Sequence, residues 1–441
     1  MKRLLPLLLC AVLALFCATT AQAAGVSITL TASEYALHYA FDAGAQDPFV
    51  ILEYATPAEK GWMMLYSADG HFEGDVSLAY SGAGGKTSVA LTSARTTGSI
   101  GKASTTLPKA ADYQKPTGKS NAKVMDFVLT ETPEGFHYAF NAIGTDYMLL
   151  YWRSKEQTVT QPVYPDENGH YEGDVVSELT FARTQFTVQV KSGSGSMKKE
   201  ATVRKGYQAP EAPQRQEGRL SGVTVCIDAG HQENGRFVNE PIGPGLTGST
   251  SGKGGMAQGT KTNRRESIVC LEIGMLLRDE LLRQGANVVM TREDQTTFHT
   301  NIERCEIAEA GGAQIMLRLH CNNSSNRSKR GIQVYGPLNS DYAKAVADAD
   351  TYREMGQKLL DAMKTRVGMT LANSTGMVRL NDNYVGNNWA KMMCFLVEMG
   401  YLSNPAEEYL LVTPVYQQWL AEGMADGVYE IAVARGWVQA Q

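Results

Sequence analysis

The sequence lacks a strong excess of charge: its formal net charge is −5 and its pI is about 5.9. This balance gives no long-range attraction to nucleic acid or to an anionic membrane surface, so neither is expected as a partner. The chain also contains no HExxH motif and no CxxC pair, which removes two of the more specific local signatures of a zinc site. With 441 residues, 43% of them hydrophobic and 20% charged, it is expected to form two or three globular domains.

Long hydrophobic runs are scarce as well, and the main one lies at the N-terminus. Residues 4–18 are almost entirely apolar, follow two basic residues, and precede the tripeptide Ala-Gln-Ala that ends at residue 23. A run of about 15 residues is shorter than the roughly 20 needed to span a bilayer, and the small-x-small tripeptide is typical of a signal-peptidase site. We therefore predict a signal peptide over residues 1–23, export of the protein, and no membrane span after cleavage.

Cysteine is sparse, with seven residues in total, of which two lie in the predicted signal peptide. The other five all lie in the C-terminal half: Cys226, Cys270, Cys305, Cys321 and Cys394. An odd number of cysteines in an exported protein cannot pair completely into internal disulfides. Each of the five lies in or next to an apolar run, so we predict buried free thiols.

The N-terminal half contains an internal repeat. The sequence HYAF begins at residues 38 and 137, and a second motif, GHFEGDV or GHYEGDV, begins at residues 70 and 169. Both matches have the same offset of 99 residues, so one duplicated unit explains them. The predicted boundaries are 24–104 and 124–205 for the two copies, with a proline-containing spacer at 105–123.

Both copies have the pattern of β-strands. Short segments rich in Val, Thr, Tyr and Phe alternate with polar residues and are separated by Gly, Asp, Asn and Pro, which predicts two all-β, sandwich-like repeats. Four of the seven histidines lie in these repeats: His38, His71, His137 and His170. We expect structural or surface roles for all four.

The composition changes again after the second copy. Residues 206–219 are rich in Pro, Gln and Glu, which is typical of an exposed linker. Residues 220–441 alternate strand and helix patterns, and this predicts an α/β domain whose central, mostly parallel sheet is covered by helices. The expected strands are 223–227, 286–290, 314–319, 331–335 and 394–397, and the expected helices are 266–283, 302–310, 341–366 and 414–434.

Residue types suited to zinc chemistry lie at the ends of these elements. His231 and His320 follow two predicted strands, Glu398 follows a third, and Glu266 begins the first helix. Functional groups in an open α/β sheet collect beyond the carboxyl ends of the strands, so we expect the four side chains to meet. Two imidazoles and one carboxylate leave a bound zinc ion with an open position, and a further carboxylate is suited to general-base catalysis.

Each of these residues also has a simpler interpretation. A single histidine after a strand is more often structural than metal-binding, and Glu266 is also placed to interact with the dipole at the start of its helix. The separations of 35, 54 and 78 residues between successive candidates are too long to form a specific local motif. The zinc interpretation is favoured because four such residues lie at element ends within one domain.

Four longer stretches of this domain form a more specific pattern. They are IDAGHQ (227–232), RRESIVCLEIGMLLRDELLRQGANVVMTRED (264–294), RLHCNN (318–323) and FLVEMGYLSNPAEEYLL (395–411). In order, spacing and context they resemble the zinc-dependent N-acetylmuramoyl-L-alanine amidases of the Amidase_3 type. The resemblance implies that His231, Glu266 and His320 bind Zn²⁺ and that Glu398 is the catalytic general base.

The resemblance also implies a substrate and a location. It implies cleavage of the amide between N-acetylmuramic acid and L-alanine of the peptidoglycan stem peptide by zinc-activated water, in a secreted protein associated with the cell wall. Asn322 and Asn323 are candidate hydrogen-bond donors to the substrate or caps of a turn, and Arg292 is a candidate for substrate contact or a structural ion pair. The departures from the family pattern are Gln232, Glu309 and the pair Met392-Met393.

Several alternatives remain open at the level of sequence. A zinc carboxypeptidase or endopeptidase acting on the stem peptide is the alternative among enzymes, and an inactive wall-binding or amidase-activating protein is the alternative outside them. The two repeats are interpreted as wall-binding modules or as rigid spacers. The long loop at residues 232–262 is interpreted as a lid or as an inhibitory plug, and the sequence does not indicate an oligomeric state.

Overall fold

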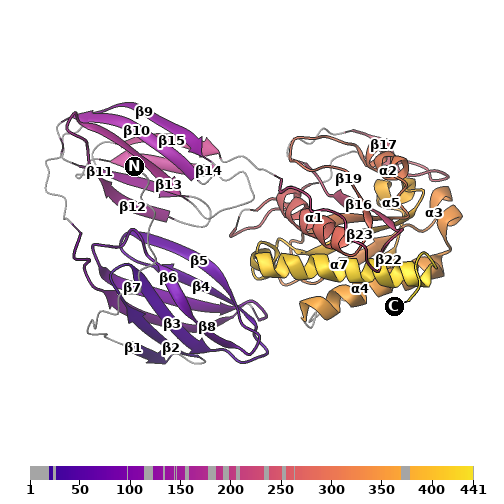
Figure 1. Cartoon of the computed structure of the whole chain (residues 1–441), viewed down its shortest axis with the longest axis horizontal. Helices are drawn as coiled ribbons and strands as arrows, with labels where there is room; N and C mark the ends of the chain where they lie inside the picture. The colour runs from indigo at the N-terminus through magenta and orange to yellow at the C-terminus, as the bar shows by residue number, and fades with distance from the viewer. Residues whose placement is uncertain are drawn as a thin grey trace.

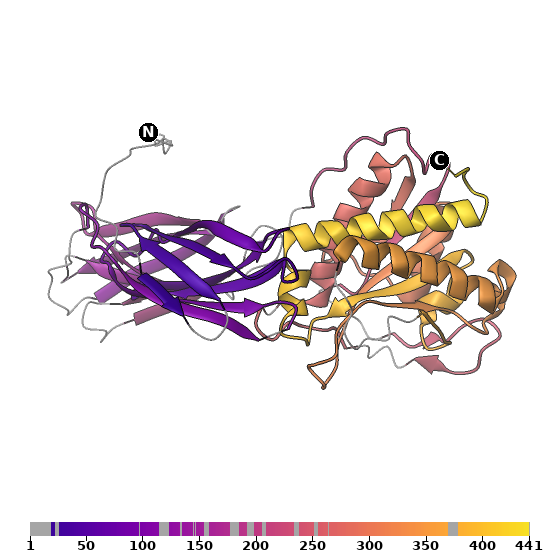
Figure 2. The same ribbon diagram turned by 90° about the horizontal axis from the view of Figure 1, so that it is seen from below.

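The computed structural model has a β-rich N-terminal half and an α/β C-terminal half joined end to end (Figures 1 and 2). Among the residues it describes, no helix is long and apolar enough to cross a membrane. The description covers residues 19–440 apart from 23–25, 97, 114–122, 133–134, 144, 146, 154–157, 177–184, 192–197, 205–208, 233–237, 251–254, 263 and 369–377.

The β-rich half contains three antiparallel sheets. The first has the order β1-β2-β3-β6 and consists of β1 (Thr19–Gln22), β2 (Ser27–Ala32), β3 (Ala36–Asp42) and β6 (His71–Ser77). The second has the order β13-β10-β9 and consists of β9 (Lys123–Thr132), β10 (Gly135–Ile143) and β13 (His170–Val176). The two sheets contain equivalent motifs, since β3 and β10 both contain HYAF and β6 and β13 both contain HxEGDV.

A third sheet of eight strands runs through both repeats, which the sequence does not indicate. Its order is β15-β14-β11-β12-β5-β4-β7-β8. The first repeat contributes β4 (Phe49–Ala55), β5 (Glu59–Tyr66), β7 (Gly85–Ser93) and β8 (Ser99–Leu107), and the second contributes β11 (Met148–Arg153), β12 (Thr158–Val163), β14 (Gln185–Lys191) and β15 (Lys198–Arg204). The two halves of this sheet meet where β12 pairs with β5 through two residue pairs.

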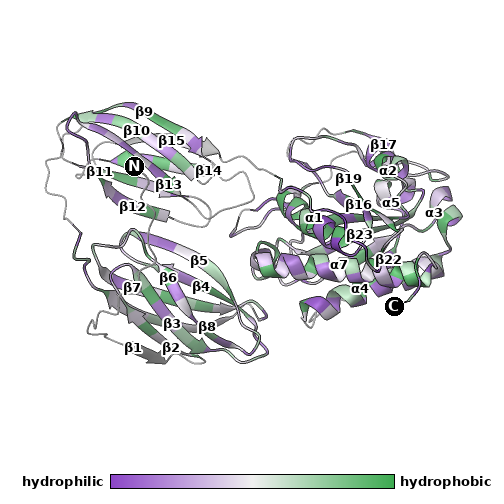
Figure 3. Cartoon of the chain, viewed as in Figure 1, coloured by the Kyte–Doolittle hydropathy of each residue, from purple (hydrophilic) through white to green (hydrophobic). Residues whose placement is uncertain are grey.

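Each repeat has its own hydrophobic core, which follows from the alternation of its strands. Along β3, Leu37, Tyr39 and Phe41 are buried while His38 lies on the outer face, as expected when successive side chains point to opposite faces of a sheet. Figure 3 shows the same alternation of hydrophobic and hydrophilic residues along other strands of the repeats. The outward position predicted for His38 is therefore the one observed.

Two features at the edges of the first repeat bear on the predicted boundaries. Strand β8 continues three residues past the predicted end at 104, because Leu107 is buried in the core of the repeat. Strand β1 lies within the predicted signal peptide and pairs with β2. Cleavage after residue 23 would remove β1 and leave β2 at the edge of its sheet; residues 1–18, which include most of the predicted signal peptide, lie outside the described residues.

The C-terminal half is built on a six-stranded sheet of order β19-β16-β20-β23-β21-β22. All neighbouring strands are parallel except β21 and β23, so the sheet is mixed but mostly parallel. Its strands are β16 (Thr224–Ala229), β19 (Asn287–Met290), β20 (Ile315–Asn322), β21 (Gln333–Gly336), β22 (Val378–Leu380) and β23 (Met393–Tyr401). The helices are α1 (Glu266–Arg283), α2 (Asn301–Ala310), α3 (Asp341–Val346), α4 (Ala349–Val367), α5 (Val385–Trp389), α6 (Glu407–Leu411) and α7 (Pro414–Ala434).

The two faces of this sheet have different coverings. Alternate residues such as Val225, Leu317 and Val397 join the large core formed with α1, α4 and α7. Residues in between, such as Cys226 and Met316, join a small core on the face of α2 and α5. The side chains of even-numbered residues of β16, β20 and β23 therefore face the more thinly covered side.

One predicted helix is interrupted. The sequence predicts a continuous helix over 341–366, but the chain forms α3 and α4 with a break at residues 347–348. Ala347 has an extended backbone, and the Asp348 side chain accepts a hydrogen bond from the amide of Thr351, which makes Asp348 the N-cap of α4. A capping residue competes with continuation of the preceding helix, and this explains the break.

The first repeat packs directly against the α/β half. Four aromatic pairs join β4 and β5 to α6 and α7, with ring centroids 4.6–5.9 Å apart: Phe49–Tyr416, Phe49–Trp419, Tyr66–Trp419 and Trp62–Tyr409. Phe49 is only 2% exposed and belongs to the large core of the α/β half. The two halves are thus joined by buried aromatic surface in addition to the predicted linker.

We expect Phe49→Ala to release this contact, because truncating a buried phenylalanine typically costs about 3–5 kcal/mol. The radius of gyration from small-angle scattering should increase, and protease cleavage within residues 206–218 should accelerate. Tyr164→Ala is the matched control, since Tyr164 is an exposed tyrosine of the second repeat. Identical scattering curves for Phe49→Ala and the unchanged protein would contradict a rigid contact.

Candidate metal centre

His231 lies in a tightly constrained turn just after β16. Gly230 donates its amide to the carbonyl of Leu319 (2.9 Å), and a Cβ atom at Gly230 would lie 2.4 Å from that same oxygen. Only glycine allows this close approach. His231 itself has a left-handed backbone with φ of 58°, an unusual conformation for a residue with a side chain.

His320 and Glu398 lie within strands, which corrects the expectation that they follow strand ends. β20 continues to Asn322 and β23 to Tyr401, and the two residues are direct neighbours across this parallel pair. Neighbouring residues in register place their side chains on the same face of a sheet. That face is the one covered by α2 and α5, so His320 and Glu398 point to the same side.

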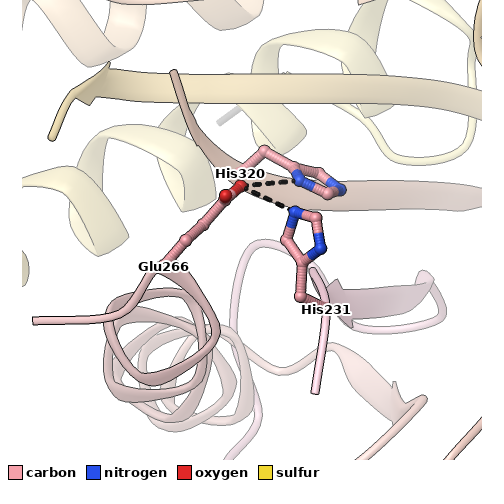
Figure 4. A group of neighbouring side chains, drawn as sticks. All are labelled: His231, Glu266 and His320. Atoms are coloured by element: carbon pink, nitrogen blue, oxygen red, sulfur yellow. Dashed lines mark hydrogen bonds and ion pairs between the residues drawn. The ribbon is translucent and has the colours of Figure 1, made fainter. Parts of the chain in front are cut away.

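The three predicted metal ligands come together (Figure 4). His231 Nε2 lies 3.1 Å from Glu266 Oε1, and His320 Nδ1 lies 2.9 Å from the same oxygen. The two imidazole rings are 4.8 Å apart and nearly perpendicular. Among the described residues this is the one group of three or more His, Cys, Asp or Glu side chains whose ligand atoms all lie within 4.8 Å of one another.

Glu266 occupies the first position of α1 and is only 3% exposed. Its Oε2 accepts a hydrogen bond from the amide of Ala257, and its Oε1 accepts one from the amide of Cys321. Burial acts to raise the pKa of Glu266, but hydrogen bonds with His231 and His320 outweigh it and lower that pKa well below its usual range. The carboxylate is therefore ionised and fixed from several sides.

The donor set fits a zinc ion. Zinc in catalytic sites is commonly held by two imidazoles and one carboxylate at about 2.0–2.2 Å, and ligand atoms around one ion are then about 3–3.5 Å apart, as the two nitrogen–oxygen distances here are. Burial lowers the pKa of His320, which favours the neutral imidazole that a metal requires. His231, Glu266 and His320 would hold the ion.

The five cysteines are free and buried, as predicted. Burial raises the pKa of the Cys321 thiol, next to His320 in sequence, and that of Cys270 on α1. The thiolate is the form that binds metals. These neutral thiols are therefore poor competitors of the imidazoles for a metal ion.

Glu398 is buried beside the three ligands without joining them. Its Oε2 atom has no hydrogen-bond partner within the described part of the chain. Burial, together with the negative charge of Glu266, raises the pKa of Glu398 to about 8. A bound cation would oppose this shift, because positive charge favours the carboxylate. Such a carboxyl group is suited to exchanging a proton near neutral pH.

A buried ion cluster lies under the His231 turn, and sequence reasoning missed it. Asp228 is fully buried and accepts hydrogen bonds from Arg304, from Arg318 Nε (2.9 Å) and from the hydroxyl of Thr291 (2.8 Å). Burial disfavours its charge, but the two guanidinium groups outweigh that effect and hold the pKa of Asp228 well below its usual range. An acidic residue directly after a predicted buried strand was the available signal.

Arg304 connects this cluster to the proposed metal ligand His231. Its guanidinium also donates to the carbonyl oxygens of Ala229 (2.9 Å) and His231 (3.1 Å) and to the side chain of Gln232. The unusual Gln232 is thereby used as a hydrogen-bond acceptor. Arg304 thus fixes the backbone on both sides of Gly230 and holds His231 in its left-handed conformation.

Arg292 supports the same turn from another direction. It is buried and donates to the carbonyl oxygens of Ala229 (2.7 Å), Gly230 (2.9 Å) and Ser267 (2.7 Å). These bonds tie the His231 turn to the start of α1, so Arg292 positions two metal ligands. The contact with substrate suggested for Arg292 stays a prediction.

The two candidate asparagines lie at the end of β20. Asn322 donates to Gln333 Oε1 (3.2 Å) and accepts from the amide of Asn323, which is exposed. Gln333 is the cross-strand neighbour of Glu398, so Asn322 lies one side chain away from the buried carboxyl group. Substrate binding by either asparagine stays a prediction, and Gln333 is a neighbour of the site that the sequence analysis did not select.

Described parts of the loop at 232–262 are tied to the domain. Glu240 accepts hydrogen bonds from the side chain of Asn301 and the amide of Ile302 at the start of α2, and the indole of Trp389 donates to Pro241. These anchors lie around β17 (Glu240–Pro241) and β18 (Ser249–Thr250). Two other positions depart from the family pattern. Glu309 forms an exposed ion pair with Lys391, and Met392 and Met393 are buried.

An α/β domain with a buried His–Glu–His cluster and an adjacent buried carboxyl group has the parts of a metal-dependent hydrolase. Comparison with protein families defines it further: residues 225–430 match the family of N-acetylmuramoyl-L-alanine amidases, Amidase_3. This C-terminal domain belongs to that family, which confirms the resemblance seen in the sequence.

Individual relatives are similar to about half of the chain. The germination-specific N-acetylmuramoyl-L-alanine amidase of Bacillus subtilis is 26% identical over 231 residues, which cover 49% of this chain and 83% of the relative. The probable cell wall amidase LytH of Staphylococcus aureus is 27% identical over 218 residues, covering 48% of this chain and 60% of the relative. The chain thus spans less than two thirds of the length of LytH.

Solved structures of amidases also align with about half of the chain. The N-acetylmuramoyl-L-alanine amidase from Clostridium difficile 630 is 23% identical with a TM-score of 0.38, covering 48% of this chain and 96% of that one. The N-acetylmuramyl-L-alanine amidase from Mycobacterium smegmatis is 17% identical with a TM-score of 0.44, covering 49% of this chain and all of that one.

We expect Asp228→Ala to destabilise the domain by about 3–5 kcal/mol, because it leaves two buried guanidinium groups without their counterion. Urea unfolding followed by circular dichroism measures the loss. Asp350→Ala is the matched control, since Asp350 forms an exposed ion pair with Arg353 and its removal should leave the urea midpoint unchanged. Equal midpoints for both variants would show that Asp228 does not support the fold.

Proposed function

We propose that this chain is a peptidoglycan hydrolase that cleaves the amide between N-acetylmuramic acid and L-alanine of the stem peptide. The observation that carries the proposal is the convergence of His231, Glu266 and His320 on one point beside the buried Glu398, inside a domain of the N-acetylmuramoyl-L-alanine amidase family. No predicted ligand is displaced from this cluster, which argues against an inactive wall-binding protein.

The chemistry divides between a metal and one carboxylate. His231, Glu266 and His320 would hold a zinc ion, which would supply Lewis-acid polarisation of the scissile carbonyl and would lower the pKa of water. Glu398 accepts the proton of the attacking water and passes it to the leaving amide nitrogen of L-alanine. The position of Glu398 serves this step, since Glu398 is the cross-strand neighbour of the proposed ligand His320.

We further propose that the protein acts outside the cell, at the cell wall. The apolar segment 4–18 and the Ala-Gln-Ala tripeptide before residue 24 support export through a cleaved signal peptide. The B. subtilis and S. aureus relatives are named as a germination-specific amidase and a probable cell wall amidase, and these names support a wall substrate.

For the repeats we favour a positioning role over independent wall binding. The aromatic contact centred on Phe49 fixes the first repeat to α7, and β5 joins the first repeat to the second. Arg330, on the loop before β21, also donates to the carbonyl of Arg95 in the first repeat. Repeats held in this way would set the orientation of the catalytic domain on its substrate.

The proposed roles of His320 as a metal ligand and of Glu398 as the general base predict different effects when each is replaced. Glu398→Gln should retain one zinc ion at the buried centre but lower turnover by at least about 100-fold, because general-base catalysis contributes roughly 10²–10⁴. His320→Ala should lose the zinc ion as well as activity. Zinc content by plasma mass spectrometry after gel filtration, measured beside activity, separates the two. Loss of zinc in Glu398→Gln would reverse the assignment of ligand and base.

The bond that is cleaved is identified from the products. Purified peptidoglycan incubated with the zinc-loaded protein should release stem peptides that begin with a free L-alanine amino group, detected by mass spectrometry. Glu398→Gln protein is the control for contaminating hydrolases. Release of D-alanine or of peptides cut internally would instead indicate a carboxypeptidase or endopeptidase, and absence of any product would indicate an inactive protein.

A further inference from the structure

Two exposed clusters of histidine and glutamate, one in each repeat, bring imidazole nitrogen and carboxylate oxygen atoms within 3.1–3.7 Å of each other. In the first, His38 and His71 lie on either side of Glu73 on the outer face of β3 and β6. His38 Nε2 is 3.4 Å from Glu73 Oε1, and His71 Nε2 is 3.6 Å from Glu73 Oε2. We call this group cluster 1.

The second repeat has the same arrangement, which we call cluster 2. His137 Nε2 is 3.1 Å from Glu172 Oε1, and His170 Nε2 is 3.7 Å from Glu172 Oε2, on the outer face of β10 and β13. The residues, two histidines and one glutamate, and the contacting atoms are the same as in cluster 1. Two copies of the repeat have therefore kept one exposed constellation in one geometry.

In both clusters the imidazoles are oriented through their other nitrogen. His38 Nδ1 is 3.1 Å from Asp75 Oδ1, and His71 Nδ1 is 2.7 Å from Asp42 Oδ1. An Nδ1–H group donated to such an acceptor leaves the lone pair on Nε2, which points toward the glutamate. Metal-bound histidines are typically oriented by a second partner of this kind.

The two clusters differ in one acceptor. This difference indicates that they share the orientation of the imidazole rather than the charge of the acceptor. Asn141 stands where cluster 1 has Asp42, and His170 Nδ1 is 2.9 Å from Asn141 Oδ1. The amide oxygen of Asn141 keeps an acceptor for the Nδ1 atom of His170, so the acceptor at this position is common to both copies whereas its negative charge is not. An imidazole oriented through Nδ1 in this way presents Nε2 as its ligand atom for a metal ion.

Packing explains the inner face of the repeated motif but not this outer face. A Cβ atom on Gly74 would lie 2.7 Å from the Tyr39 hydroxyl, and one on Gly173 would lie 2.6 Å from the Tyr138 hydroxyl, so these glycines are needed by the core aromatics. The side chains of His71 and Glu73 are 50% and 58% exposed, and exposed ion pairs contribute little to stability. Packing of the core therefore does not account for these outer residues.

We propose that each cluster binds one divalent transition-metal ion such as zinc, through His38, His71 and Glu73 in cluster 1 and through His137, His170 and Glu172 in cluster 2. Imidazole nitrogen and carboxylate oxygen are the ligands that such ions prefer. The residue opposite each glutamate is small, Ala40 or Ala139, which leaves room for the carboxylate to move onto the ion.

These sites are weaker than the buried centre. Within the described residues only His231, Glu266 and His320 hold three ligand atoms within 4.8 Å, so the donors of each cluster must draw together around the ion. Solvent competes at both clusters because their side chains are exposed. The inference is independent of the amidase proposal, since it concerns other residues and another readout.

The test is a count of zinc ions on the full chain without a histidine tag. Protein stripped with a chelator is dialysed against increasing Zn²⁺, and bound zinc is measured by plasma mass spectrometry. We expect three ions per chain at saturation, one tight and two at least tenfold weaker. The His231→Ala/His320→Ala variant should keep the two weak ions only, so failure of the buried centre and failure of the clusters give different counts.

Variants of the clusters complete the test. His38→Ala/His137→Ala should bind one ion, and Glu73→Gln/Glu172→Gln, which preserves side-chain volume, should weaken both exposed sites at least tenfold while circular dichroism stays unchanged. Asp350→Asn, at an exposed carboxylate elsewhere, is the control and should still bind three. A count of one for the unchanged protein, a count of three for His38→Ala/His137→Ala, or unchanged affinity of the exposed sites in Glu73→Gln/Glu172→Gln would overturn the proposal.

Discussion

The metal centre depends on one buried carboxylate, Asp228. It is fully buried between Arg304 and Arg318, and an unpaired charge at that depth would be costly. Once paired, Arg304 has donors left for the carbonyl oxygens around Gly230, and these bonds hold His231 in a left-handed conformation that a histidine does not adopt by preference. The position of the first metal ligand therefore follows from the cluster beneath it.

Side chains alternate between the two faces of the central sheet, so residues that pack in the large core and residues of the site lie on opposite faces. Odd-numbered residues of β16, β20 and β23 join the large core with α1, α4 and α7, whereas His320 and Glu398 face the thinly covered side. Glu266 reaches the same point from the start of α1, where the backbone amides of Ala257 and Cys321 donate hydrogen bonds to its carboxylate. Rigid elements on three sides thus preorganise the site, which is what catalysis by positioned charges needs.

Much of this could be predicted from the sequence because the signals were local or shared with a family. The bounds of α1 and α7 follow from hydrophobic spacing and from stop signals, and the four central residues were selected because they lie at the ends of predicted elements and match the Amidase_3 pattern. The exact extent of β20 and β23 could not, because a strand continues as long as its neighbour offers pairing partners. That is why His320 and Glu398 lie inside strands.

Long-range polar contacts were beyond local patterns altogether. Asp228 pairs with residues 76 and 90 positions away, and no periodicity encodes such a choice of partner. The aromatic contact of Phe49 and the joined sheet of the two repeats are long-range in the same sense. The repeats themselves were visible because duplication leaves a fixed offset, but their outer histidines acquired meaning only when the orientation of each imidazole was known.

Zinc K-edge X-ray absorption on the His38→Ala/His137→Ala chain, which lacks the two proposed exposed sites, tests the central claim most directly when this chain is loaded with one equivalent of zinc. The account predicts nitrogen and oxygen ligands at about 2.0–2.2 Å with outer-shell scattering from two imidazoles, and loss of this spectrum in His320→Ala. A sulfur shell at about 2.3 Å, which would place the ion on Cys270 or Cys321, or a spectrum unchanged in His320→Ala, would contradict it.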